Sequence, residues 1–129
     1  MLNNLARLHA MCFPHRPWSA DDFMDLKKSG CEIIASDNGF IVWRVVGTDA
    51  EIYSIGVAPD ARRTGIAAAL LGIMENAVKK DGATRIILEV RENNAAARAL
   101  YEKCGYKIDG RRPKYYEGTT DAILMSKNL

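Results

Sequence analysis

A short basic segment near the middle of the chain, residues 57–68, contains residues of the kinds that bind phosphate. Pro59 prevents the preceding apolar run from continuing simply as a strand, and helical spacing begins at about Gly65. The first turn of a helix presents unpaired backbone N–H groups and the positive end of the helix dipole, which together bind phosphate. Arg62 and Arg63 can add charge-assisted hydrogen bonds. The segment therefore predicts a phosphate site, and the competing interpretation is a solvated arginine pair at a helix N-terminus.

The glycine pattern of this segment excludes two common phosphate-binding motifs. The segment lacks the GxGxxG glycines of a dinucleotide-binding turn and the GK[ST] residues of a nucleoside-triphosphate loop. Gly65 lets the backbone approach a ligand closely, and Ala67 and Ala68 keep the following helical turn small. The predicted phosphate site is therefore of a different type.

A second group of polar residues stands among apolar neighbours in residues 84–104. Glu89 lies in a strand-like run at 84–90, where a lone carboxylate needs an explanation. The simplest explanation is a glutamate at the rim of a sheet, paired with an arginine. Tyr101 lies on the apolar stripe of the next helix and could be a core tyrosine, and Asn94 could cap that helix. The residues alone leave open whether this group has a chemical role.

The elements that would position these residues follow from hydrophobic spacing and turn residues. The first half predicts two helices followed by a β-meander, and the second half alternates helices and strands before two final strands joined by a polar loop. This order predicts an α+β (broadly α/β) domain with helices on both faces of a mixed, mostly antiparallel sheet, rather than a doubly wound parallel sheet. We expect helices at 3–12, 19–30, 66–80 and 94–104, and strands at 31–35, 40–46, 51–57, 84–90, 106–109 and 122–125.

Composition limits the class of protein. The 129 residues are the size of one domain, spanning 1–129, with 48% hydrophobic and 26% charged residues. A net charge of +2 is too small to predict nucleic-acid binding. The three cysteines lack CxxC spacing, which argues against a disulfide framework or a structural zinc site and favours a cytoplasmic protein. No run predicts a membrane span. His9 and His15 lack metal-ligand spacing, so we expect both to be structural or exposed and expect no metal.

Several segments, in order, resemble the GNAT N-acetyltransferase superfamily. Residues 62–67, RRTGIA, resemble its acetyl-CoA signature (R/Q)xxGx(G/A), with alanine where many relatives have a second glycine. Residues 88–106, LEVRENNAAARALYEKCGY, resemble the LEVRxxNxxAxxLYxxxGF segment of the RimI-type branch, the ribosomal-protein-alanine N-acetyltransferases. RRPKYY at 111–116 and DAILM at 121–125 are similar to the RRxxYY and DAIxM tail of that branch. The resemblance covers about residues 51–125.

The resemblance implies a GNAT acyl-CoA N-acyltransferase fold, acetyl-CoA as cosubstrate, and direct attack of an amine on the thioester. It also implies that the strand before the phosphate turn separates from its neighbour at a bulge, so that the pantetheine arm fills the gap. By the same resemblance, Glu89 would be the general base and Tyr101 the general acid, while Tyr115 and Tyr116 would help to hold a peptide. The implied contacts with acetyl-CoA are Ile55, Gly56, Val57, Arg62, Arg63, Thr64, Gly65, Ile66, Ala67, Ala68 and Asn94.

Two segments depart from the family pattern. Relatives usually begin with a strand before the first helix, and residues 1–4 leave little room for one, so we expect this first strand to be missing. The strand at 31–35 would then have a bare edge or pair with another chain. The loop at 117–120 is shorter than usual where the peptide should dock.

Proton affinities bear on which amine is acetylated. An α-amine has a reference pKa of ~7.7–8.0 and lysine one of ~10.4, so an N-terminal amine is partly neutral near pH 7 and a single carboxylate suffices as base. This favours a protein or peptide N-terminus as substrate, and the resemblance implies a ribosomal small-subunit protein. Two alternatives stay open: a GNAT enzyme for lysine or a small amine, and a non-catalytic acyl-CoA-binding subunit.

Overall fold

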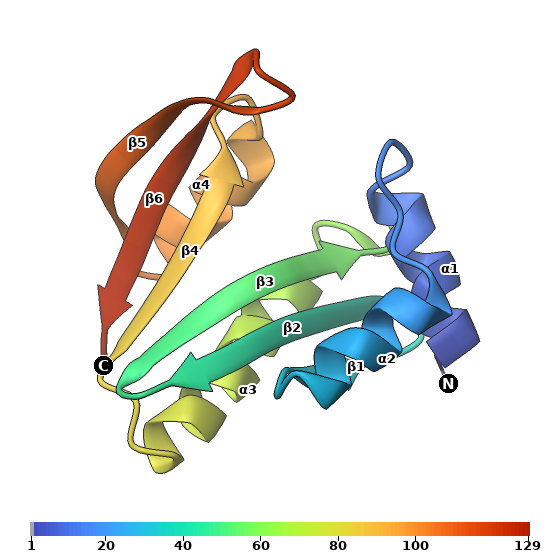
Figure 1. Cartoon of the computed structure of the whole chain (residues 1–129), viewed down its shortest axis with the longest axis horizontal. Coiled ribbons are helices and arrows are strands. Elements are labelled where there is room, and N and C mark those ends of the chain that lie inside the picture. Colours follow the sequence, from blue (N-terminus) through green and yellow to red (C-terminus); the bar gives the residue numbers. More distant parts are fainter. Residues whose placement is uncertain (1) are drawn as a thin grey trace.

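The computed structural model describes residues 2–129, in which helices cover both faces of one six-stranded sheet (Figure 1). The strand order is β1-β2-β3-β4-β6-β5, and every neighbouring pair is antiparallel except β3 and β4. The predicted fold class is therefore confirmed. The helices are α1 (Leu2–Cys12), α2 (Ala20–Lys28), the short 3-10 helix η1 (Pro59–Ala61), α3 (Ile66–Lys80) and α4 (Ala95–Lys103). The strands are β1 (Glu32–Ala35), β2 (Gly39–Val46), β3 (Asp49–Val57), β4 (Arg85–Arg91), β5 (Lys107–Tyr116) and β6 (Thr120–Asn128).

The helix starts follow local signals in the sequence. The Ser19 hydroxyl accepts the Asp22 N–H, and the Asp22 carboxylate accepts the Ser19 N–H, forming a capping box at α2. Asn94 Oδ1 accepts the Ala97 N–H at 3.2 Å and so caps α4, as one interpretation of the sequence proposed. The start of α3 differs, because Gly65 precedes it with a left-handed φ of 83° and no side chain of residues 2–129 caps it.

The sheet carries a separate apolar layer on each face. Helices α3 and α4 cover one face, where Met74 and Ile86 are fully buried. Helices α1 and α2 cover the other face, where Phe23 and Phe40 are fully buried. Fully burying a side chain of this kind contributes about 1.5–3 kcal/mol. Because helices pack on both sides, side chains from both layers can reach an opening between strands.

The parallel strands β3 and β4 separate part way along their length (Figure 1). They pair only through residues 49–52 of β3 and 85–88 of β4, after which β3 continues through 53–57 and β4 through 89–91 without pairing to each other. β3 also bulges at Tyr53, the extra residue where the register with β2 shifts. A bulge bends its strand and increases the local twist. The structure therefore has the strand separation that the family resemblance implied.

Gly56 lets α1 lie against β3 beside this opening. A Cβ atom at Gly56 would stand 2.7 Å from Phe40 Cε1 and 2.9 Å from Cys12 Sγ, which is closer than packed atoms approach. Cys12 Sγ also donates a hydrogen bond to the Val57 carbonyl at 3.3 Å. The missing side chain at Gly56 therefore sets how closely α1 approaches β3, a packing role that sequence analysis did not foresee.

The last two strands are longer than predicted. Sequence analysis expected strands at 106–109 and 122–125 with a polar loop between them, whereas β5 and β6 form a hairpin with a short turn after Tyr116. The predicted strands were too short, because the polar residues 110–116 belong to β5, where ion pairs hold some of their charged side chains. Arg111 Nη1 lies 2.7 Å from both Asp121 and Glu92.

Strand β1 lies at one edge of the sheet and pairs with β2 alone. Within residues 2–129, helix α1 precedes every strand, whereas the expected lack of a first strand concerned residues 1–4. Of residues 1–4, on which that expectation rested, Met1 lies outside the described residues. No helix in the described part of the chain is long and apolar enough to cross a membrane.

Candidate active site

The opening between β3 and β4 forms a cavity of about 240 Å³. Glu89 of β4 and Tyr101 of α4 both line it, so the structure brings the two predicted catalytic residues together. Among the predicted contacts with acetyl-CoA, Ile55 and Asn94 also line it. The other lining residues are His9, Phe13, Arg16, Trp18, Ile52, Tyr53, Ser54, Leu88, Val90, Arg91, Ala97 and Tyr116.

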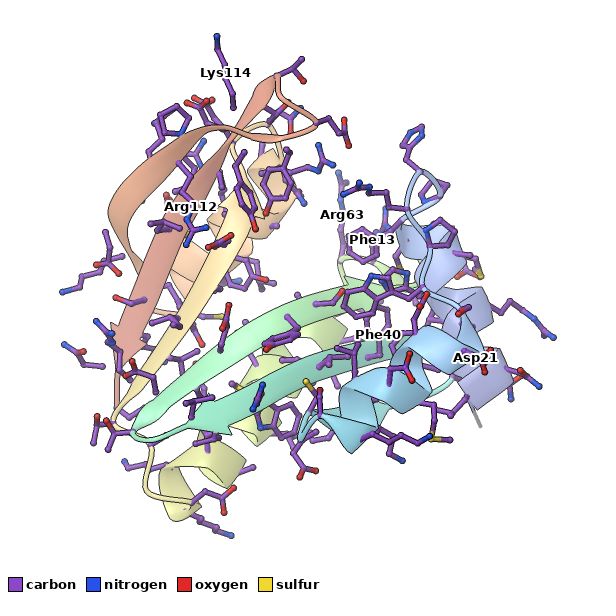
Figure 2. All side chains as sticks on the ribbon, viewed as in Figure 1. Phe13, Asp21, Phe40, Arg63, Arg112 and Lys114 are labelled. Carbon is purple, nitrogen blue, oxygen red and sulfur yellow. The ribbon has the colours of Figure 1, made fainter. Side chains whose placement is uncertain are left out.

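Glu89 projects to the face of the sheet that α1 and α2 cover, because its neighbours Leu88 and Val90 belong to the layer under α3 and α4. Glu89 Oε1 lies 3.2 Å from Nη2 of Arg112, which reaches it from β5 (Figure 2). The side chains of the pair are 23% and 54% exposed, and ion pairs this accessible are weak. The arginine-paired glutamate considered from the sequence is therefore present.

Tyr101 is also the core tyrosine considered from the sequence. It is 5% exposed, and its ring lies 5.6 Å from that of Tyr106. Burial, and to a smaller degree the charge of Tyr116, raise the pKa of the Tyr101 hydroxyl above its usual value near 10.0. Tyr101 therefore keeps its proton near neutral pH while facing the cavity.

The tip of the β5–β6 hairpin is fastened to the end of β4 beside the cavity. The Arg91 guanidinium lies 4.5 Å from the Tyr116 ring centroid and pairs with Glu117, and that hydrogen bond lowers the pKa of Glu117. Burial and the charge of Glu89 raise the pKa of Tyr116. Of the two tyrosines predicted to hold a peptide, Tyr116 lines the cavity, whereas Tyr115 is 50% exposed at the surface.

The predicted phosphate turn lies between η1 and α3, and residues 62–65 are exposed. Arg63 (φ 65°) and Gly65 (φ 83°) both adopt left-handed backbone conformations. Thr64 Oγ1 donates to the Ala61 carbonyl at 2.6 Å, and Arg62 Nε donates to the Val57 carbonyl at 3.1 Å. The Arg62 side chain is thus directed back toward β3 and braces the turn. The first turn of α3 is apolar, so its backbone N–H groups face solvent without a side-chain partner in residues 2–129.

The wall opposite the hairpin comes from α1 and the loop that follows it, which sequence analysis did not assign to the site. His9 is 2% exposed, and its ring stacks on Trp18 at 4.6 Å and lies 4.8 Å from Phe13. Figure 2 shows Phe13 close to the end of β3. One signal could have found this wall: His9 is a polar residue on the same helical stripe as Leu5 and Cys12.

Burial also makes His9 a source of pH-dependent stability. Desolvation lowers the pKa of His9 from 6.5 to about 4, although the nearby Asp22 acts in the opposite direction. Between these two pH values the unfolded chain binds a proton that the folded chain does not. The free energy of unfolding should therefore fall as pH is lowered through this window, by at most about 1.4 kcal/mol per pH unit for this one group. Urea unfolding of the protein and of His9→Phe at pH 6.5, 5.5 and 4.5 measures the difference. An identical slope in the two proteins would contradict this assignment.

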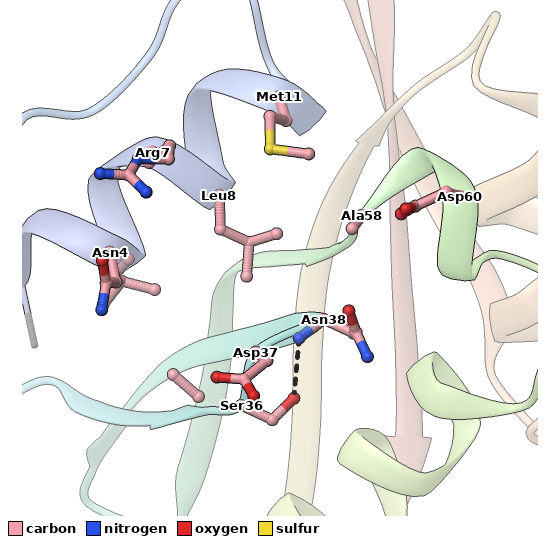
Figure 3. Close-up of a pocket in the computed structure, with 11 residues that line it drawn as sticks. Asn4, Arg7, Leu8, Met11, Ser36, Asp37, Asn38, Ala58 and Asp60 are labelled. Carbon is pink, nitrogen blue, oxygen red and sulfur yellow. Dashed lines mark hydrogen bonds between the residues drawn. The ribbon is translucent and has the colours of Figure 1, made fainter.

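A second cavity, of about 500 Å³, lies between α1 and the β1–β2 turn (Figure 3). Its apolar floor includes Leu8 and Ala58, and Asp37 and Asp60 stand at its rim. None of the predicted site residues lines it. No group of three His, Cys, Asp or Glu side chains that could hold a metal ion occurs within residues 2–129.

The sheet is opened between two parallel strands, and the exposed turn that follows β3 leads into α3, as the resemblance to GNAT acetyltransferases implies. Residues 2–106 match the sequence profile of the acetyltransferase (GNAT) family. The chain belongs to this family.

Among its relatives, the [ribosomal protein bS18]-alanine N-acetyltransferase of Escherichia coli strain K12 is 40% identical over 90 residues, which are 67% of this chain and 61% of that protein. The chain therefore spans less than two thirds of the length of this relative. The enzyme of the same name from Salmonella typhimurium strain LT2 is 34% identical over 121 residues, covering 85% of this chain and 80% of that one. The crystal structure of the Escherichia coli ribosomal-protein-S18-alanine N-acetyltransferase superposes with a TM-score of 0.87 at 30% identity, over 99% of this chain and 87% of that one.

Proposed function

We propose that the chain is an acetyl-CoA-dependent N-acetyltransferase that acts on the N-terminal α-amine of a protein. The observation that carries the proposal is the shared cavity of Glu89 and Tyr101 between β3 and β4. The names of the relatives support the α-amine, and a ribosomal small-subunit protein is the corresponding partner. The three free cysteines support a cytoplasmic setting.

The residues present fit acetyl-CoA. Its diphosphate would bind the exposed N–H groups of residues 65–68, with Arg63 and Thr64 at the turn, because a helix N-terminus favours negative charge. Its pantetheine arm would enter between β3 and β4 along Ile55, where the strands do not pair. Arg62 would support the turn from behind through its bond to Val57. Acetyl-CoA then supplies an activated acetyl group as a thioester.

The chain's own groups would handle the two protons of the reaction. Glu89 takes a proton from the incoming ammonium group, directly or through water, which leaves a neutral amine to attack. Tyr101 donates its proton to the thiolate as the carbon–sulfur bond breaks, and the second proton of the attacking nitrogen then returns to the Tyr101 oxygen, which leaves an amide with one N–H. A hydroxyl whose pKa lies above 10 is a poor proton donor to a thiolate whose thiol has a pKa of ~8.5. The proton transfer must therefore accompany cleavage of the carbon–sulfur bond.

The use of a single carboxylate as base favours an α-amine over a lysine. An α-amine with a reference pKa of ~7.7–8.0 is partly neutral near pH 7, whereas a lysine amine at ~10.4 needs two to three further pKa units of help. A lysine-acetylating enzyme would instead show activity that rises tenfold per pH unit well above neutrality.

Tyr101→Phe should lower kcat by roughly 10²-fold while leaving acetyl-CoA affinity unchanged, because only the proton donor is lost. Steady-state kinetics and calorimetric titration with acetyl-CoA measure the two quantities. The matched control is Tyr106→Phe, which removes a hydroxyl that bonds Glu75 away from the cavity at 3.0 Å. That variant should lose stability but keep its turnover. Full activity of Tyr101→Phe would remove Tyr101 from the mechanism.

The decisive test of the function is mass spectrometry of a mixed peptide library after incubation with the protein and acetyl-CoA. We expect the acetyl group on N-terminal α-amines. Acetylation of lysine side chains alone would support the small-amine or lysine alternative. Binding of acetyl-CoA without any acetylated product would support the non-catalytic subunit.

A further inference from the structure

His9 is a polar ring enclosed by aromatic rings. Phe23 and Phe40 lie 5.6 Å and 5.5 Å from it, in addition to the stacked Trp18. Its imidazole is nevertheless one wall of the cavity that holds Glu89 and Tyr101. A buried imidazole needs partners for its two nitrogens, so its hydrogen bonds show what it can offer a ligand.

One nitrogen of His9 is already used within the protein. The backbone N–H of Trp18 donates to Nδ1 at 3.0 Å, so the neutral ring carries its proton on Nε2. No hydrogen bond within residues 2–129 involves Nε2. In that part of the chain, the fully buried side-chain polar atoms without a hydrogen bond are Trp43 Nε1 and Arg98 Nε, so Nε2 is not fully buried. Nε2–H is therefore a fixed donor that remains accessible from the cavity.

The position of His9 on the sheet indicates which substrate meets this donor. The phosphate turn and α3 lie on one face of the sheet, whereas α1 lies on the other, where Glu89 also projects. Acetyl-CoA held at α3 would thus reach the opening from the face away from His9. The acceptor amine must approach Glu89, and so it comes from the face that carries His9.

We propose that His9 Nε2–H donates a hydrogen bond to the first peptide carbonyl of the acceptor and thereby orients its α-amine toward Glu89; this rests on the function proposed above. In an N-terminal residue, only the α-carbon and the carbonyl carbon separate the amine nitrogen from that oxygen. In lysine, four methylene carbons, the α-carbon and the carbonyl carbon separate the ε-amine from the nearest carbonyl oxygen. A fixed donor that binds the carbonyl next to the reacting amine therefore favours N-terminal amines. The lowered pKa of His9 keeps the ring neutral and its single donor in place near pH 7.

The test pairs a change in the protein with a change in the substrate. One peptide has its normal first amide, and a second has an (E)-alkene in its place, which keeps the shape and removes the carbonyl oxygen together with the amide N–H. Only the part of the alkene effect that His9→Phe abolishes therefore reports on the carbonyl. Both are assayed with the unmodified protein, with His9→Phe, which keeps an aromatic ring, and with His9→Gln, whose amide can restore a donor near Nε2. Phe23→Leu is the control, because it disturbs the same aromatic cluster outside the cavity.

We expect the alkene to lower kcat/KM of the unmodified protein by roughly three- to tenfold, the value of one neutral hydrogen bond, mainly through the KM for the peptide. His9→Phe should respond little to the alkene, His9→Gln should respond partly, and Phe23→Leu should respond as the unmodified protein does. Equal sensitivity to the alkene in the unmodified protein and His9→Phe would overturn the inference, as would no effect of the alkene on the unmodified protein, even if His9→Phe fails to fold. Failure of the unmodified protein to acetylate the normal peptide would instead refute the proposed function, and the inference with it.

Discussion

Glu89→Gln is expected to lower kcat by about 10²- to 10⁴-fold, the usual contribution of a positioned general base. The substitution keeps the shape and hydrogen-bonding capacity of the side chain and removes the site that accepts the ammonium proton. The affinity for acetyl-CoA should not change, because the predicted diphosphate contacts lie at residues 62–68. Single-turnover kinetics with an alanine-terminated peptide measure the chemical step, and calorimetry measures the binding of acetyl-CoA.

The ion pair with Arg112 offers a control that separates the two interpretations of Glu89. If Glu89 served only to hold Arg112 on the hairpin, Arg112→Leu would impair turnover as much as Glu89→Gln. If Glu89 is the base, Arg112→Leu should have a much smaller effect, because the pair is accessible and weak. Comparable losses in the two variants would show that Glu89 acts through the ion pair.

Gly65→Val should abolish measurable binding of acetyl-CoA. The φ of 83° at Gly65 is left-handed, which costs a residue with a side chain about 1–2 kcal/mol, and a β-branched residue tolerates it poorly. A Cβ at Gly65 meets no atom within 4 Å, so the side chain would project into the open space beside the exposed N–H groups. Both effects remove the surface on which the diphosphate is expected to lie. Calorimetric titration with coenzyme A measures the loss.

Gly72→Ala is the matched control for that variant. Gly72 lies within the same helix, α3, and a Cβ there also meets no atom within 4 Å. Because alanine favours a helix over glycine by roughly 0.5–1 kcal/mol, Gly72→Ala should raise stability and leave the affinity for coenzyme A unchanged. Unchanged affinity in Gly65→Val would refute the phosphate-turn interpretation.

Sequence patterns predicted the elements of this fold better than their pairing. The helix predicted at 66–80 has the same bounds in α3, because its apolar spacing is regular over four turns. The insertion of β6 between β4 and β5 could not be predicted, since pairing depends on residues far apart in the chain. The length of the two strands of the β5–β6 hairpin was underestimated because Gly110 and Pro113 interrupt the pattern of β5, and the ion pairs of the hairpin form only after folding.

The site was predictable where a motif marked it and was missed elsewhere. Motifs singled out Glu89, Tyr101 and the turn at 62–67, and the first two share a cavity in the structure. The wall made by His9 and Trp18 was not assigned to the site from the sequence. Its placement follows from the close contact between α1 and β3. Cys12 and Val57, which form a hydrogen bond in this contact, are 45 residues apart in the sequence.

The divergence of β3 from β4 leaves each strand with one satisfied border and one border of free peptide groups. Buried peptide groups require partners. A ligand bound between the separated ends of β3 and β4 could therefore form hydrogen bonds with the backbone, as a further strand would. Occupancy and folding are then thermodynamically linked: a ligand at a hundred times its dissociation constant adds about 2.7 kcal/mol to the native state. If acetyl-CoA binds between β3 and β4 as proposed, it should therefore stabilise the fold as well as supply the acetyl group.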